Sequence, residues 1–133
     1  MTIYRRVFLA DDDADDRDLF IDALQEIDNT IYCYHATNGE SALKVLSGDI
    51  LERPELIFLD LNMPKINGKE VLKTLKNSAE LSNIPVIMYS TFFSPEDVKE
   101  IIELGASHYL IKQTNFKDLC NALKVILTTA WQV

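Results

Sequence analysis

The chain has 133 residues, of which 47% are hydrophobic and 26% are charged. This is the mix of an ordinary globular protein, and it argues against disorder, collagen-like repeats and a coiled coil. The length predicts a single domain, residues 1–133, without room for a second hydrophobic core. With 13 basic and 21 acidic residues, the net charge is −8, and that charge opposes direct binding to nucleic acid.

The first residues and the cysteines indicate a soluble, cytoplasmic protein. The first ten residues contain two arginines but only a short apolar run, unlike a signal peptide. No run reaches the ~18 apolar residues of a membrane span. Cys33 and Cys120 are far apart and in no metal-ligand spacing. We expect both to be small buried side chains in a reduced compartment, without a disulfide.

Five short apolar runs, rich in branched and aromatic residues, are typical of parallel strands covered on both faces. In chain order they are Val7–Ala10, Ile31–Tyr34, Leu56–Leu61, Val86–Tyr89 and Tyr109–Ile111. Helical apolar periodicity follows each run. Its stripes lie within residues 19–27, 42–46, 71–75, 98–102 and 116–126.

Several helix ends are also marked in the sequence. The segment Thr37–Glu40 predicts a capping box for the second helix. Ser94 and Pro95 are typical of the start of the fourth helix, which we expect to end at Gly105. Asn115 or Thr114 is expected to cap the last helix. Four acids are interpreted only as favourable charges in the first turn of the first helix, namely Asp13, Asp15, Asp16 and Asp18.

This alternation predicts an α/β fold of the (βα)5 type. Right-handed crossovers place helices on both faces of a parallel sheet. The simplest arrangement is a doubly wound, five-stranded sheet in the order 2-1-3-4-5, and its ligands bind outside the carboxyl ends of the strands.

Charged and hydroxyl side chains follow four of the five predicted strands. Asp11 and Asp12 follow the first strand, Asp60 stands at the end of the third, Ser90 follows the fourth and Lys112 the fifth. Carboxylates brought together at one edge repel one another unless a cation compensates them. Mg²⁺ prefers such oxygen ligands. A carboxylate beside Mg²⁺, an ammonium group and a hydroxyl is suited to attack a phosphoryl group.

Four segments carry a resemblance to a known family. They are FLADDD at the first strand, LDLNMPKINGKE around Asp60, PVIMYST at the fourth strand and GASHYLIK at the fifth. In this order, over residues 5–127, the chain resembles the CheY-like receiver domain of two-component response regulators. The resemblance implies a flavodoxin-like or CheY-like fold.

The resemblance also implies roles for the acidic residues. Asp60 matches the phosphoacceptor, which would receive a phosphoryl group with the help of Mg²⁺. Asp11 and Asp12 match the acidic pair, in which Asp12 binds the metal directly and Asp11 acts largely through water. Asn62 would contribute its backbone carbonyl to Mg²⁺.

The remaining roles concern the switch. Ser90 and Lys112 match the hydroxyl and the lysine that engage the phosphoryl group, and Tyr109 matches the aromatic residue that rotates inward on activation. Gln113 stands where the family usually has proline, so we expect a trans peptide bond after Lys112. Thr91 replaces a usually smaller residue.

The function implied is that of a phosphorelay switch. A histidine kinase or phosphotransfer protein would phosphorylate Asp60, and an unknown output protein would bind the face formed by the fourth helix, the fifth strand and the fifth helix. The protein would promote its own phosphorylation and dephosphorylation without being a turnover enzyme. We expect a monomer or a phosphorylation-linked dimer, and a receiver that acts without an effector domain.

Three other functions remain open. A phosphate-independent adaptor is opposed by Asp60, Ser90 and Lys112, but Gln113 leaves it open. An aspartyl-phosphate phosphatase of the haloacid dehalogenase type would need a second acid where Asn62 stands. A flavodoxin-like cofactor binder would need a phosphate-binding loop where the chain has the acids Asp11–Asp13, which repel an anion.

Five further residues have open roles. Phe92 and Phe93 either cover the site, bind a partner or pack against the following helix. His35 and His108 are interpreted as surface or core histidines, not as phosphoryl carriers or metal ligands. Trp131 either packs at the end of the last helix or frays.

Overall fold

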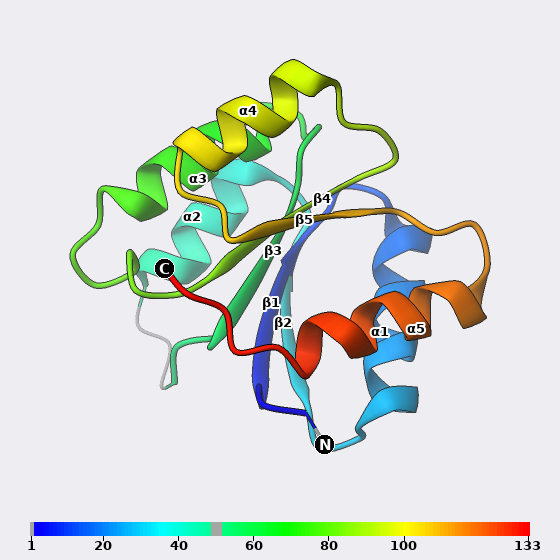
Figure 1. Cartoon of the computed structure of the whole chain (residues 1–133). Coiled ribbons are helices and arrows are strands. Elements are labelled where there is room, and N and C mark those ends of the chain that lie inside the picture. Colours follow the sequence, from blue (N-terminus) through cyan, green and yellow to red (C-terminus); the bar gives the residue numbers. More distant parts are fainter. Residues whose placement is uncertain (1, 49–51) are drawn as a thin grey trace.

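The computed structural model describes residues 2–48 and 52–133, which form five parallel strands and five helices. The strands lie in the order β2-β1-β3-β4-β5, as the alternation of strands and helices predicts. Figure 1 shows α1 and α5 on one face of the sheet and α2, α3 and α4 on the other. The elements are β1 (Arg6–Ala10), α1 (Ala14–Ile27), β2 (Tyr32–Ala36), α2 (Gly39–Ser47), β3 (Leu56–Asp60), α3 (Gly68–Lys76), β4 (Val86–Ser90), α4 (Pro95–Glu103), β5 (His108–Ile111) and α5 (Phe116–Leu127).

Two hydrophobic cores lie on the two faces of the sheet, because successive side chains of a strand point to opposite faces. Phe8 and Ile57 pack in the core beneath α2, α3 and α4. Phe58 packs in the other core, where Phe20 of α1 meets its ring at 4.9 Å in an edge-to-face arrangement. The central strands β3 and β4 are buried along their whole length.

The edge strands differ from the prediction. The second strand was expected at Ile31–Tyr34 and covered on both faces, but β2 runs from Tyr32 to Ala36 and is partly exposed. Its bounds are set by pairing with β1, in which Arg6 lies opposite Tyr32 and Ala10 lies opposite Ala36. β5 is also an edge strand with exposed positions. Apolar character therefore predicts the central strands better than the edges, whose bounds depend on hydrogen bonds to a neighbour.

Helix α2 begins differently from the prediction. The capping box expected over Thr37–Glu40 is wrong, because Asn38 is the N-cap and accepts a hydrogen bond from the backbone N–H of Ser41. A capping box forms instead at α3, between Asn67 and Glu70. Asn115, not Thr114, caps α5.

Helix α4 begins and ends where the sequence predicts. Ser94 and Asp97 form a capping box, with Pro95 at the first helical position. At the other end, Gly105 has a φ of 104°. The N–H of Ala106 donates to the carbonyl of Ile101 at 2.9 Å and that of Gly105 to Ile102 at 3.1 Å. These two bonds form a Schellman motif, which needs a residue that tolerates positive φ.

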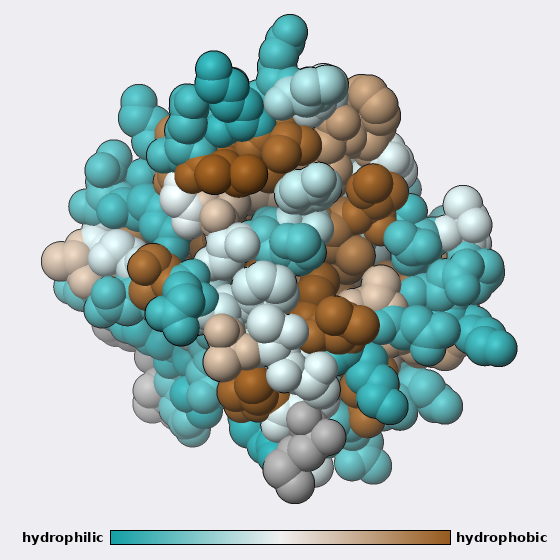
Figure 2. Space-filling view, viewed as in Figure 1, coloured by the Kyte–Doolittle hydropathy of each residue, from teal (hydrophilic) through white to brown (hydrophobic). Residues whose placement is uncertain are grey.

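The face formed by α4, β5 and α5 carries scattered apolar side chains. Figure 2 shows hydrophobic residues over these elements, separated by hydrophilic ones. Ile102, Ile111 and Val125 are exposed there. No helix in the described part of the chain is long and apolar enough to cross a membrane. Cys33 and Cys120 are free, as predicted, but half-buried where full burial was expected.

Candidate functional site

The acidic residues predicted from the strand ends do meet at the carboxyl edge of the sheet. Asp11 follows β1 and is fully buried, while Asp60 ends β3 and is 4% exposed. Asp12 is exposed. One carboxylate oxygen from each of the three lies within 4.8 Å of the other two. The two strands pair in parallel, so their ends reach the same edge and bring the carboxylates together.

Lys112, just beyond the end of β5, lies among these acids. Its Nζ is 3.0 Å from Asp11 Oδ2 and 3.2 Å from Asp60 Oδ2. Its shortest ion pair, 2.8 Å, is with Asp16 Oδ2. Asp16 was interpreted only as a favourable charge at the start of α1, and that interpretation is incomplete. The first turn of α1 lies beside the end of β5, a neighbourhood that arises from tertiary packing and that no local pattern in the sequence indicates.

Burial and charge set the protonation behaviour of this cluster. Burial, and then the hydrogen bond and charge of Asp11, raise the pKa of Asp60 to about 7, although the N–H of Asn62 and the charge of Lys112 act in the opposite direction. Burial alone lowers the pKa of Lys112, but Asp16, Asp11 and Asp60 together raise it above its ordinary value. Lys112 therefore keeps its positive charge beside the carboxylates at neutral pH.

The donor set of this edge fits a hard divalent cation. Asp11 Oδ2 is buried without a hydrogen-bond partner among the described residues, although the ammonium group of Lys112 lies 3.0 Å from it. The other oxygen of Asp11 accepts the N–H of Asp13 at 3.0 Å, which fixes the orientation of the carboxylate. Asp12, the exposed member of the cluster, connects the site to solvent. Carboxylate oxygens are the ligands that Mg²⁺ or Mn²⁺ takes.

The loop after β3 is held tightly against the site. The N–H of Asn62 donates to Asp60 Oδ1 at 3.0 Å. Gly68 N–H donates to the carbonyl of Leu61 at 3.1 Å. A Cβ on Gly68 would lie 2.3 Å from the carbonyl oxygen of Asp60, so only glycine permits this approach. Hence the backbone of Asn62 stays beside the carboxylate of Asp60.

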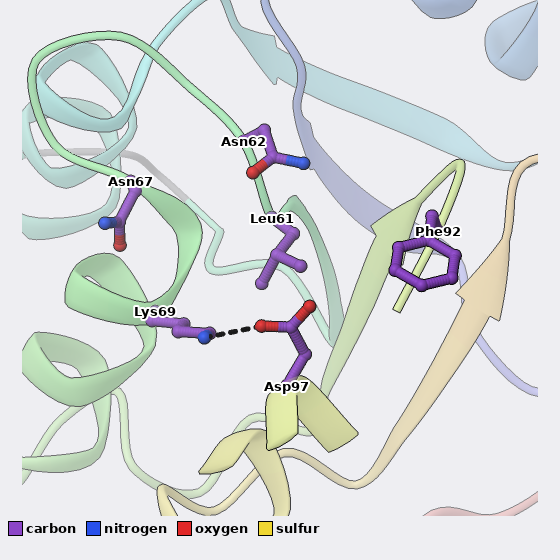
Figure 3. A pocket seen from close by; sticks show the side chains of 6 residues that line it. All are labelled: Leu61, Asn62, Asn67, Lys69, Phe92 and Asp97. Carbon is purple, nitrogen blue, oxygen red and sulfur yellow. Dashed lines mark hydrogen bonds and ion pairs between the residues drawn. The ribbon is translucent and has the colours of Figure 1, made fainter. Parts of the chain in front are cut away.

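A pocket of about 280 Å³ lies next to this loop. Figure 3 shows Asn67 on one side of it and Phe92 on the other, with Lys69 of α3 and Asp97 of α4 pointing toward each other. Lys69 Nζ pairs with Asp97 Oδ1 at 2.7 Å, which ties the two helices together. Phe92 is 69% exposed. The pocket thus opens onto the loop after β3, which carries Asn62.

Ser90 and Tyr109 belong to one connected region beside the acids. Ser90 is 2% exposed, and its hydroxyl donates to the carbonyl oxygen of Phe92 at 3.0 Å. Phe93 is buried, and its ring centroid lies 4.9 Å from that of Tyr109. The two phenylalanines therefore differ in which of their expected roles, packing inside or lying at the surface, the structure supports. Phe93 packs inside, and Phe92 remains at the surface of the pocket.

Gln113 and the two histidines lie outside the acidic cluster. Among the residues that the structure describes there is no cis peptide bond, as expected for the Lys112–Gln113 link. The side chain of Gln113 donates to the carbonyl of Ile111 at 2.8 Å and turns back on its own strand. His35 lies near the end of β2 and His108 at the start of β5. Neither histidine belongs to the carboxylate cluster.

One family model and two relatives of known name are similar to this chain. The model of the "Response regulator receiver domain" family matches residues 7–124. Response regulator Rcp1 of Synechocystis sp. is 46% identical over 67 residues, covering 50% of this chain and 46% of Rcp1. Sensory transduction protein LytT of Oceanobacillus iheyensis is 32% identical over 126 residues, covering 92% of this chain and 49% of LytT. In these two sequence matches the chain spans about half the length of the relative.

Solved structures match more completely. The phosphorylated cyanobacterial phytochrome response regulator RcpA superposes with a TM-score of 0.84 and 31% identity, covering 93% of this chain and 91% of RcpA. The Mn²⁺-bound form of Rcp1 gives a TM-score of 0.80 and 32% identity, covering 97% and 99%. The chain belongs to the response regulator receiver domain family of two-component signalling.

Proposed function

We propose that the protein is a phosphoacceptor receiver in which Asp60 takes a phosphoryl group from a histidine kinase or a phosphotransfer protein. The observation that carries this proposal is the position of Asp60. It is buried at the carboxyl edge of the sheet, 3.2 Å from the ammonium group of Lys112 and beside the carboxylates of Asp11 and Asp12. The similarity to phosphorylated RcpA supports the same reading.

The transfer requires a nucleophile and compensation of negative charge. A carboxylate oxygen of Asp60 attacks phosphorus, the phosphorus–nitrogen bond of the donor histidine breaks, and the histidine nitrogen keeps the electron pair. Lys112 lies where it can pair with an oxygen of the transferred group. The buried Asp11 and the adjacent N–H of Asn62 hold Asp60 in one orientation.

The same cluster is proposed to bind Mg²⁺. Asp11, Asp12, Asp60 and the backbone carbonyl of Asn62 would hold the ion, and when bound it offsets charge on the carboxylates and on the phosphoryl oxygens. The Mn²⁺-bound form of the similar Rcp1 supports a divalent ion at this place. The protein is proposed not to be a turnover enzyme, because it promotes only the phosphorylation and dephosphorylation of its own Asp60.

Phosphorylation is proposed to act through Ser90 and Tyr109. The Ser90 hydroxyl, which now donates to the carbonyl of Phe92, turns to the phosphoryl group, and Tyr109 moves inward. The population of two conformations shifts because only one of them makes these contacts. The face of α4, β5 and α5 then binds an output protein, or a second copy in a phosphorylation-linked dimer. Residues 1–133 are proposed to act as a single receiver domain.

The phosphatase and the adaptor are less well supported. Asn62 is exposed and stands where an aspartyl-phosphate phosphatase would need an acid. A receiver that works without phosphate has no need of a half-buried lysine within 3.2 Å of three carboxylates. The arrangement is costly unless the site is used, since bringing like charges together opposes folding.

Intact-mass spectrometry tests the proposal directly. The wild-type protein is incubated with acetyl phosphate and Mg²⁺, beside a metal-free sample and the Asp60→Asn variant. We expect one added phosphoryl group in the wild-type protein with Mg²⁺ and none in the other two samples. Asp22→Asn, an exposed position in α1, is the matched control and should gain the group like the wild type. Equal phosphorylation of Asp60→Asn would contradict the proposal.

A further inference from the structure

A row of aromatic rings connects the region of Ser90 with the last residues of the chain. The centroid of Phe93 is 4.9 Å from Tyr109, and that of Tyr109 is 5.6 Å from His108. His108 stacks on Trp131 at 4.9 Å, with only 17° between the ring planes. The row therefore passes from the loop after β4, across the start of β5, to the segment 128–133 that follows α5.

Several hydrogen bonds seat this last segment. The indole N–H of Trp131 donates to the carbonyl of Ile126 at 3.0 Å. Its backbone N–H donates to the hydroxyl of Tyr4 at 3.0 Å, and Tyr4 in turn donates to the carbonyl of Thr129 at 2.8 Å. The segment leaves α5 and turns back toward the beginning of β5 (Figure 1). Trp131 thus packs instead of fraying.

One hydrogen bond joins the segment to the start of β5, and another lies within the loop after β4, at the other end of the row. Ser107, just before β5, donates its hydroxyl to the carbonyl of Gln132 at 2.8 Å. At the other end, Ser90 donates to the carbonyl of Phe92, the neighbour of the buried Phe93. Closely packed side chains pass from one arrangement to another instead of deforming gradually. We therefore expect that a rotation of the Ser90 hydroxyl away from Phe92 moves Phe93 first and then Tyr109, which packs against it.

We propose that the segment 128–133 is a latch whose closure depends on the phosphorylation site. When Ser90 turns to the phosphoryl group and Tyr109 moves inward, His108 loses the aromatic neighbour on its strand, and its stack with Trp131 loosens. The latch then leaves the start of β5. His108 and Trp131 are positioning residues in this device, since neither touches the acidic cluster. The latch rests on the proposed function of Asp60.

Trp131 reports on the latch directly, because the sequence contains a single tryptophan. The full chain with Mg²⁺ is titrated with beryllofluoride, an analogue of the phosphoryl group, and binding is followed separately by fluorine NMR. We expect the tryptophan emission to shift to longer wavelength and acrylamide quenching to increase, both saturating together with binding. Binding without any change of Trp131 would overturn the latch and leave the function of Asp60 standing. Absence of binding would overturn both.

Two histidine variants test the route. His108→Leu removes the stacking ring and is expected to bind beryllofluoride while losing the emission change that accompanies binding. His35→Leu is the matched control, an exposed histidine near the end of β2 at the opposite edge of the sheet, and should keep both binding and the change. Circular dichroism checks that each variant is folded. A full emission change in His108→Leu would show that the aromatic row does not carry the signal.

Discussion

Lys112 is the residue on which the stability of the acidic edge depends most. Its ammonium group is within 3.2 Å of Asp11, Asp16 and Asp60. Lys112→Met would leave these carboxylates facing one another in a poorly hydrated place, and we expect the free energy of unfolding to fall by about 2–4 kcal/mol. Urea denaturation in metal-free buffer measures the loss.

The control for this variant is Lys117→Met, an exposed lysine of α5, which should change stability little. Mg²⁺ should restore part of the stability of Lys112→Met, because a second cation can take over the compensation of the carboxylates. Unchanged stability of Lys112→Met without metal would show that the ion pairs contribute nothing.

Asp28, far from this edge, should make stability depend on acid pH. Hydrogen bonds from Thr2 and Thr30, and then the charge of Arg5, hold the pKa of Asp28 below its ordinary value of 3.8. A folded-state pKa that is lowered stabilises the protein above the unfolded pKa, and this stabilisation is lost as the pH falls below 3.8. Asp28→Asn is therefore expected to be less stable than the wild type at pH 7.

Urea midpoints measured from pH 7 down to pH 3 test whether the stabilisation by Asp28 is lost toward acid pH. The difference between the wild type and Asp28→Asn should shrink only in the acid part of the range. Asp22→Asn, which replaces an exposed acid of α1, should show no such dependence. A difference that stays constant with pH would mean that the charge of Asp28 has no part in it.

Helix α4 depends on the backbone at its end. Gly105, with its φ of 104°, makes the Schellman motif possible, and an added Cβ would lie 3.2 Å from Cγ of Lys76. We expect Gly105→Ala to lower the free energy of unfolding by about 1–2 kcal/mol, the cost of a side chain in the left-handed region. Thermal or urea denaturation measures it, and Gly105→Asn should cost less because asparagine tolerates this region better. Equal losses would point to the contact with Lys76 instead.

The elements show which sequence signals are sufficient and which are not. The central strands and the start of α4 follow from local patterns, because continuous apolar runs are typical of strands covered on both faces and the run from Ser94 to Asp97 holds both members of a capping box. The bounds of β2 depend on its ladder with β1, and the cap of α2 lies at Asn38 instead of Thr37 because the hydrogen bond of Ser41 decides it. Competition between neighbouring cap residues is a matter of geometry, which the sequence does not express.

The whole molecule brings the site together in a way that is only partly predictable. Asp11, Asp60 and Lys112 could be placed at one edge from the sequence, because the carboxyl ends of parallel strands share an edge. The pairing of Asp16 with Lys112 depends on how α1 packs beside β5. The aromatic row to Trp131 joins the loop after β4 to the last segment, and no local pattern links them.

Metal binding should stabilise the whole fold. A ligand that binds only the folded state raises stability by about 1.4 kcal/mol at ten times its dissociation constant. We expect millimolar Mg²⁺ to raise the melting temperature of the wild-type protein. Potassium chloride of equal ionic strength is the reference, because salt also screens the net charge of −8.

The variant Asp12→Asn removes an exposed carboxylate of the cluster without disturbing the core, and it should lose most of the Mg²⁺ effect. Asp22→Asn should keep it. If Mg²⁺ raised the melting temperature equally in both variants, the ion would bind elsewhere on the acidic surface.

The most direct test of the account is to locate the phosphoryl group. An aspartyl phosphate is reduced by borohydride to homoserine, which peptide mass spectrometry assigns to one position. After treatment with acetyl phosphate and Mg²⁺, the account predicts homoserine in place of Asp60 and at no other aspartate. Homoserine at Asp11 or Asp12, or a phosphorylated protein that yields no homoserine at all, would contradict the assignment of Asp60 as the phosphoacceptor.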